Sequence, residues 1–389
     1  MNEFVGKFMF HPVGHGLFYS GTIKNCNDNN HFSFVYDCGG CNPNIINSAI
    51  ENADLPSTIN LLIISHFHED HINGVLKLKN KHKIETVILP YLDPTSKNIY
   101  MTYLASENND LSGSKLKDLE NFICDPVNFF SKDTKVFFIS NDVKSEESKP
   151  PKGELDFDWL NCIPDNEKKV PGNASYGSKE WSFHFFMPKT TTNDKFIELQ
   201  EFFENNHIEP NNVMKTEERW EIIKNKVKKF NLNNNISNLV CAHGPTENVS
   251  IQTICNNKFI PSELFDHCWE YDCWCYSHYR YWHDGNIGFQ FLTGDAEIDK
   301  QDDFIKNYQS DLRKSILFQV PHHGSKANWK DWFSEYQPFC NLWPVTHNAN
   351  HEYRKGIFPS ATFSYIAPYS VTEVKSTGLG IQIHFTDKI

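Results

Sequence analysis

The sequence predicts an α/β protein in which sheets and helices form layers, and three observations support this fold class. Short apolar runs of strand length recur along the chain, for example at residues 61–64, 86–90 and 289–292. Some of them alternate with stretches of helical periodicity, such as residues 43–52. Side chains of the metal-ligand type follow several of these runs directly, which is where open α/β sheets gather their sites.

The elements can be predicted in order from these runs and from the turn residues between them. The chain opens with a strand over residues 1–10, resumes as a strand over 17–22 and turns through the Asn- and Asp-rich residues 25–30. The next expected elements are strands at 32–36, 61–64 and 86–90 and helices at 43–52 and 75–78, after which the chain is less regular, with short apolar pieces such as 136–139. They are followed by strands at 181–188, 239–241, 289–292 and 316–320, helices at 196–203 and 213–230, and a final strand pair over 371–385.

Length and composition indicate a large globular protein. The chain has 389 residues, 39% of them hydrophobic and 22% charged. Its formal net charge of −12 argues against a protein that coats long stretches of nucleic acid. Because we see neither a secretory leader nor an apolar run of the roughly 20 residues needed for a membrane span, we expect a cytoplasmic protein without a membrane partner. The 11 cysteines are then expected as free or metal-bound thiols.

The pattern His66-x-His68-x-Asp70-His71 carries most of the functional information. Three imidazoles and a carboxylate fall within six residues, immediately after the apolar run 61–64. Imidazole nitrogen and carboxylate oxygen are the ligands that zinc and related metals prefer. In an extended turn, His66 and His68 can point at one metal ion, and Asp70 and His71 can turn toward a second. The pattern therefore predicts a metal centre.

Two further strand ends carry matching residues. Asp295 follows the run 289–292, and His322 and His323 follow the run 316–320. A carboxylate has two oxygens, so Asp295 is suited to bridge two cations. One of the two histidines can complete the shell of the second metal while its neighbour faces the substrate. We favour His323 as the ligand and His322 as the catalytic residue, although the sequence does not separate them.

These motifs resemble the metallo-β-lactamase fold, of which His66-x-His68-x-Asp70-His71 is the signature. Further pieces are similar to the branch that contains the hydrolase domain of bacterial competence DNA-uptake proteins. They are Val13-Gly14-His15-Gly16, Asp37-Cys38-Gly39, Leu292-Thr293-Gly294-Asp295, Pro321-His322-His323-Gly324-Ser325, the Asn-rich strand 235–240, and Asn350-His351 with Pro359. They occur in the order expected for that branch, over most of the chain.

The resemblance implies a four-layer αββα sandwich, formed as a single domain over 1–389 with insertions at about 93–170 and 244–285. It also implies two divalent metal ions, usually zinc and sometimes manganese. His66 and His68 would bind one ion, Asp70 and His71 the other, and Asp295 would bridge them. Asp37 would brace the histidine loop by hydrogen bonding, without touching metal.

The implied reaction is attack of a metal-bound hydroxide on an ester, most favourably a phosphodiester, with Asp70 holding or deprotonating the water. The substrate would be a nucleotide or nucleic acid, and the acidic surface favours a small or single-stranded one. Two alternatives remain open. One is hydrolysis of a non-nucleotide ester, such as a phosphocholine-type or lactone substrate, and the other is a non-catalytic binding or assembly subunit.

Some residues are harder to assign. Members of the family often place one more histidine on the first metal, and His243 is the best candidate here because it follows a strand. His184, inside an expected strand, is interpreted as a core or surface residue. His15, between two glycines on the first hairpin, is expected as a turn residue, with an approach to the metal site and a contact to substrate as the alternative, and Asn238 and His351 are further candidates for substrate binding.

A segment rich in cysteine, histidine and aromatic residues lies within the second expected insertion, at 267–283. Three interpretations stay open: a structural zinc site, a lid over the active site that stacks a base or a cation, and a packed aromatic ribbon with reduced cysteines. The Cys273-x-Cys275 spacing matches no standard zinc knuckle.

Overall fold

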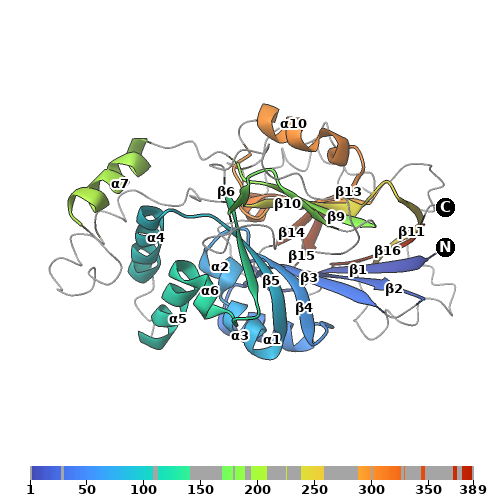
Figure 1. The fold of residues 1–389 in the computed structure, drawn as a ribbon, viewed down its shortest axis with the longest axis horizontal. Helices are drawn as coiled ribbons and strands as arrows, with labels where there is room; N and C mark the ends of the chain where they lie inside the picture. Colours follow the sequence, from blue (N-terminus) through green and yellow to red (C-terminus); the bar gives the residue numbers. More distant parts are fainter. Residues whose placement is uncertain are drawn as a thin grey trace.

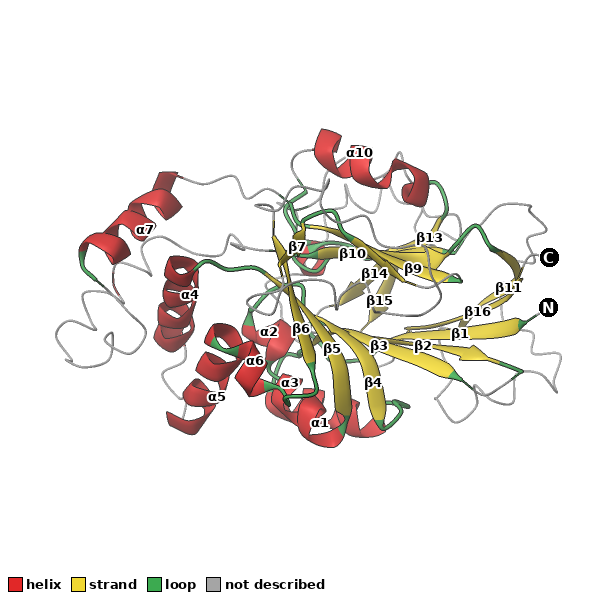
Figure 2. Ribbon diagram, viewed as in Figure 1, coloured by secondary structure: helices red, strands yellow, loops and turns green. Residues whose placement is uncertain are grey.

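The structure of the protein is a computed structural model. It describes residues 2–27, 30–107, 113–140, 169–177, 180–188, 194–207, 225, 238–257, 288–298, 301–325, 328, 343–346, 371–374 and 379–387. Two β-sheets face each other, and helices cover the outer face of each (Figures 1 and 2). The predicted four-layer αββα architecture is therefore confirmed.

The larger sheet has nine strands in the order β11-β16-β1-β2-β3-β4-β5-β6-β7. In chain order they are β1 (Glu3–Phe10), β2 (Phe18–Asn25), β3 (His31–Cys38), β4 (Thr58–Ile63), β5 (Lys83–Pro90), β6 (Lys135–Ser140), β7 (Lys169–Pro171), β11 (Val249–Asn257) and β16 (Leu379–Asp387). Pairing is antiparallel from β11 to β3 and parallel from β3 to β7. In the parallel part, the carboxyl ends of β3 and β4 lead into the site described below.

The smaller sheet has five strands in the order β13-β12-β10-β9-β8. They are β8 (Ser175–Gly177), β9 (Trp181–Phe186), β10 (Val240–Pro245), β12 (Phe289–Leu292) and β13 (Ser315–Phe318). A separate parallel pair joins β14 (Trp343–Thr346) to β15 (Val371–Val374). β12 and β13 are also parallel, so their carboxyl ends reach the same edge.

Helices form the two outer layers (Figure 2). On the larger sheet lie α1 (Pro43–Asn52), α2 (Glu69–Ile72), α3 (Val75–Lys81), α4 (Pro94–Glu107), α5 (Gly113–Cys124) and α6 (Pro126–Phe129), and α10 (Gln301–Leu312) covers the smaller one. α7 (Asp194–Asn205) lies beside α4, where Thr95 Oγ1 donates to Glu204 Oε1 at 3.3 Å. α1 begins where Asn42 caps its first amide groups, and Ile46 and Ile50, four residues apart, are buried on one face.

Three apolar clusters fill the spaces between the four layers. The largest lies between the sheets, where the rings of Phe34 and Phe183 meet edge to face at 4.9 Å. A second cluster joins the larger sheet to its helices, and a third joins the smaller sheet to α10 through residues such as Phe291 and Tyr308. Strands buried on both faces explain the near-continuous apolar runs in the sequence.

Within residues 93–170, where an insertion is expected, β6 pairs with β5 and extends the larger sheet. Within the other expected insertion, 244–285, β11 pairs with β16 at the edge of the same sheet. The expected strand pair over 371–385 is wrong, because β15 pairs with β14 and β16 pairs with β1 and β11. Local patterns gave no sign of these long-range pairings.

Several elements match their predicted ranges closely. α1 covers the predicted 43–52 and β12 the predicted 289–292, while α7 extends the predicted 196–203 by two residues at each end. The expected helix 213–230 and the segment 267–283 lie outside the described residues. Within the part of the chain that is described, no helix is both long enough and apolar enough to cross a membrane.

Candidate metal centre

Three loops from the two sheets converge on one place. β4 leads into the histidine loop, residues 65–71, and β12 leads into the turn 293–295. β13 leads into the short 3₁₀ helix His322–Gly324. His322 N–H donates to Gly294 O at 3.0 Å, so the second and third loops are fixed to each other. Asp70, His71, Asp295 and the two neighbouring histidines are thus brought together, as their positions at strand ends suggested.

The carboxylate of Asp295 lies at the middle of this centre, buried to 3% exposure of the side chain. Its Oδ2 is 3.8 Å from His66 Nε2 and 3.6 Å from His322 Nε2. Its Oδ1 is 3.3 Å from His71 Nε2 and 3.5 Å from His323 Nε2. The two oxygens therefore face two different groups of imidazoles.

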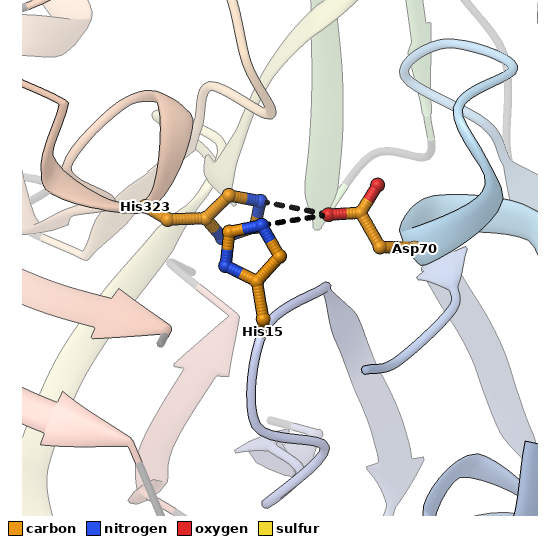
Figure 3. A group of neighbouring side chains, drawn as sticks. All are labelled: His15, Asp70 and His323. Atoms are coloured by element: carbon orange, nitrogen blue, oxygen red, sulfur yellow. Dashed lines mark ion pairs between the residues drawn. The ribbon is translucent and has the colours of Figure 1, made fainter. Parts of the chain in front are cut away.

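We define two subsets of donors from these contacts. The first subset is His66, His68 and Asp295, and the second contains His71, Asp295 and His323, each set with donor atoms within 4.8 Å of one another. Asp70 adjoins the second subset, because its Oδ2 lies 3.2 Å from His323 Nε2. His15 reaches the same oxygen of Asp70 at 3.4 Å, from the side opposite the ribbon that carries Asp70 (Figure 3).

Hydrogen bonds behind the histidine loop set its tautomers. Asp37 accepts from Ser65 N–H at 2.6 Å, from the Ser65 hydroxyl at 2.5 Å and from His71 Nδ1–H at 2.7 Å. Because the Ser65 proton goes to Asp37, Ser65 Oγ accepts from His66 Nδ1–H, 2.9 Å away. Both imidazoles thus carry their proton on Nδ1, which leaves the Nε2 lone pair directed into the centre.

The His322–His323 pair is oriented in the same way from the other sheet. His323 Nδ1–H donates to Thr346 O at 3.0 Å, at the end of β14. His322 Nδ1–H donates to Asn328 Oδ1 at 3.0 Å. The Nδ2 group of Asn328 donates to Asp295 O and Ala296 O, which fixes the orientation of its side-chain amide. Both histidines have positive φ, 49° and 51°. Two consecutive non-glycine residues in this disfavoured region spread their rings apart, toward the two oxygens of Asp295.

The donors fit divalent metal ions on two grounds. Among the described residues, the buried Nε2 atoms of His66, His71 and His323 have no hydrogen-bond partner, although each is aimed at the centre. Two nitrogen or oxygen donors on one tetrahedral zinc, each about 2.1 Å away, lie about 3.4 Å apart. The contacts of the second subset, 3.2–3.5 Å, have that spacing.

The electrostatics of the centre favour positive charge. Burial lowers the pKa of His71, but the carboxylates of Asp295, Asp70 and Asp37 outweigh it and raise the pKa well above its ordinary value. Burial raises the pKa of Asp295, yet the surrounding histidines hold it well below its ordinary range. For His66, burial and the neighbouring His71 and His68 lower the pKa, so this imidazole stays neutral and able to ligate.

Glycines allow the loops to approach each other. Gly294 has φ +52°, and a Cβ there would lie 2.8 Å from Ser65 Cβ. Its N–H and that of Thr293 both donate to Gln319 Oε1, at 3.3 and 3.0 Å. Thus the turn that carries Asp295 rests directly on the residue that orients His66.

The structure does not bring His243 to the centre. It lies on β10 in the apolar layer between the sheets, where its Nε2 is 3.0 Å from Tyr19 Oη and its ring packs against Phe34 at 4.9 Å. The expectation that His243 is a ligand of the first metal therefore finds no support in its position. β10 is buried along its whole length, so His243 near its end faces the core.

The other candidates divide as follows. Asn238 is buried next to Leu239, whose N–H donates to Ser65 O at 2.8 Å, so it lies near the histidine loop. His184 lies apart from the centre and its Nδ1 contacts Asp311 Oδ2 at 2.6 Å. His351 lies outside the described residues.

Sequence reasoning missed the residues that orient the histidines. Ser65, Gln319, Asn328 and Thr346 all take part through the hydrogen bonds given above. For Ser65 and Gln319 a signal existed, since each is a polar residue at the end of a buried strand, next to a motif residue. For Asn328 and Thr346 the signal was absent, because their contacts depend on how distant loops fold.

Comparison with known proteins agrees with this architecture. Residues 28–147 match the model of the metallo-beta-lactamase superfamily. This matched part of the chain includes the histidine loop, and the metallo-beta-lactamase superfamily is the class of protein expected for two facing sheets with a histidine–aspartate centre at their edge. No curated protein matches the sequence significantly.

Three solved structures illustrate what the chain is similar to. The metallo-beta-lactamase fold protein YhfI from Bacillus subtilis is 11% identical with a TM-score of 0.24, over 48% of this chain and 53% of that one. A long form RNase Z from yeast is 9% identical with a TM-score of 0.35, over 89% and 36% of the respective chains. Human tRNase Z, short form, is 12% identical with a TM-score of 0.24, over 46% and 58%. The chain thus spans less than two thirds of each.

Proposed function

We propose that the protein is a dinuclear metal-dependent hydrolase that cleaves phosphodiester bonds. The observation that carries the proposal is the buried Asp295 carboxylate, with each oxygen facing a separate group of histidine Nε2 atoms. A bridging carboxylate between two donor groups is suited to hold two cations close together. Imidazole-rich donors favour zinc, with manganese as the alternative.

The metal residues follow from the two subsets. His66, His68 and Asp295 would hold one ion, and Asp70, His71, Asp295 and His323 the other. When bound, the two ions would lower the pKa of a water molecule toward neutrality and neutralise charge that develops on the phosphoryl oxygens. A phosphodiester suits this pair, because it presents both an attacked phosphorus and a leaving oxygen to the cations.

Two side chains at the open side of the centre are proposed to act on the substrate. Asp70 is 23% exposed, and although burial raises its pKa, His71 and His323 hold it below its ordinary range, so the carboxylate is ionised. Its oxygens can orient the attacking water by accepting a hydrogen bond from it, while the lowered pKa makes the carboxylate a weak proton acceptor. His322 is 27% exposed and its Nδ1 is held by Asn328, so Nε2 is the atom available to the substrate.

The substrate is proposed to be a nucleotide or a short single-stranded nucleic acid. Its negative phosphate would be drawn to the cations, while the net charge of −12 repels a long polyanion. Salt-dependent nuclease assays test this point. Activity on short single strands should exceed activity on long duplex at low salt, and steeply salt-sensitive cleavage of long duplex would contradict it.

Metal analysis and a substrate panel test the proposed reaction. The purified full-length protein should contain stoichiometric divalent metal and hydrolyse bis-p-nitrophenyl phosphate in preference to a p-nitrophenyl phosphocholine ester or a lactone. The double variant His68→Ala, Asp295→Ala should lose at least about 100-fold in rate. His31→Ala, at an exposed position at the start of β3, is the matched control and should keep full activity. Absence of metal, or unchanged activity in the double variant, would overturn the proposal.

A further inference from the structure

His15 belongs to a loop that the proposed reaction does not yet use. The loop, residues 13–17, joins β1 to β2, and the side chain of His15 points toward the carboxylate of Asp70 (Figure 3). His15 Nε2 lies 3.4 Å from Asp70 Oδ2, and its ring centroid is 4.1 Å from that of His323. His15, Asp70 and His323 form a group whose donor atoms lie within 4.8 Å of one another.

The backbone holds this loop firmly in place. Leu17 N–H donates to Asp70 O at 3.2 Å, Gly39 N–H donates to Leu17 O at 2.9 Å, and Cys41 N–H donates to Val13 O at 3.1 Å. Gly16 has φ +135°, and a Cβ on it would lie 2.5 Å from Asp70 O. The loop therefore lies directly against the histidine loop, and His15 is presented to Asp70 by the main chain itself.

One atom connects this group to the second subset. His323 Nε2 lies 3.2 Å from Asp70 Oδ2 and 3.5 Å from Asp295 Oδ1, while His323 Nδ1 is occupied by Thr346 O. A single Nε2 lone pair can bind a single ion. The group with His15 and the group with His71 share His323, so both lie at the same end of the centre.

From this we propose that His15 is a metal-binding residue of the second subset, which then offers five protein donors. They are His15, Asp70, His71, Asp295 and His323. The His15–Asp70 separation of 3.4 Å lies within the range that two donors, each about 2.1 Å from one zinc, can span, and it exceeds a usual N–H···O hydrogen bond of about 2.9 Å. This inference rests on the proposed dinuclear centre and assigns the tighter ion to the second subset.

The test is a Zn²⁺ titration of the metal-free full-length protein by calorimetry. We expect two unequal sites in the wild-type protein. His15→Ala should weaken the tighter site by at least about tenfold and leave the weaker one, whereas His68→Ala should weaken the weaker one. The exposed control His31→Ala should bind both ions like the wild type.

A second variant separates ligation from hydrogen bonding. His15→Gln keeps an amide N–H that can reach Asp70 but supplies no imidazole, so its Zn²⁺ affinity should match that of His15→Ala. The visible spectrum of the Co²⁺-loaded protein should change in both variants, since one nitrogen ligand is lost. Full affinity in His15→Ala, or its recovery in His15→Gln, would overturn the role of His15 and leave the dinuclear centre standing. A wild-type protein that binds no Zn²⁺ would instead overturn the centre itself.

Discussion

The carboxylate of Asp37 accepts the Nδ1–H of His71 at 2.7 Å, and neither side chain is exposed to solvent. Asp37 has φ +55°, an unusual conformation for a residue other than glycine, at the end of β3. The same carboxylate holds Ser65, so one buried acid orients two of the histidines that face Asp295. The centre therefore depends on a residue that does not contact the ion positions.

Asp37→Asn tests this dependence. An amide in place of the carboxylate would donate to His71 Nδ1, which moves the imidazole proton to Nε2 and removes the lone pair from the centre. Zn²⁺ affinity measured by calorimetry should fall by about ten- to one hundredfold. Wild-type affinity in a folded Asp37→Asn protein would show that the His71 tautomer is set in another way.

Metal removal should lower the stability of the fold. An ion that binds the folded chain alone adds about 4 kcal/mol per site when its free concentration is a thousand times the dissociation constant. Thermal unfolding should therefore occur at a lower temperature in excess chelator than in excess Zn²⁺. The Asp295→Ala variant, which lacks the shared carboxylate, should respond less, and an equal response would contradict the position of Asp295 at the middle of the centre.

Gly294→Ala should destabilise the protein. The left-handed backbone at φ +52° and the 2.8 Å approach to Ser65 Cβ both oppose a methyl group. A loss of about 1–3 kcal/mol in the free energy of unfolding is expected from urea titration. Zn²⁺ affinity should fall as well, because Asp295 moves with the turn. An unchanged urea midpoint would mean that the turn can shift without cost.

His243 predicts a pH dependence of stability. Burial lowers its pKa from 6.5 to about 3, and its proton on Nε2 is donated to Tyr19, whose own hydroxyl donates to Gln290. Between about pH 3 and pH 6.5, His243 is protonated in the unfolded chain and neutral in the folded chain. The free energy of unfolding should therefore fall with pH through this window, by about 1.4 kcal/mol per pH unit from this residue.

The variant His243→Gln isolates that contribution. It keeps a donor for Tyr19 but has no titrating ring, so its stability should fall less steeply between pH 6 and 4 in urea titrations. His11, whose pKa burial also lowers to about 3, titrates in the same window and remains in both proteins. Identical slopes in wild type and variant would rule out His243 as a source of acid sensitivity.

The sequence predicted the layers and most of the donors for a definite reason. Buried strands read as apolar runs, and ligand residues placed directly after them, such as Asp295 and His323, converge because parallel strands end at one edge. His243 followed a strand too, but β10 is buried on both faces, and an apolar run does not show which way a polar residue at its end will point. The left-handed backbone of His322 and His323 and the partners Asn328 and Thr346 depend on tertiary contacts, which no local pattern carries.

The donors of the centre come from opposite ends of the polypeptide. His15 and the histidine loop lie near the amino terminus, whereas Asp295, His322 and His323 follow β12 and β13 of the other sheet. During synthesis, the early donors would leave the ribosome long before the later ones and could not assemble the centre without them. Metal capture would therefore require synthesis to have passed His323, and a product truncated before β12 would lack Asp295, whose two oxygens face the two subsets.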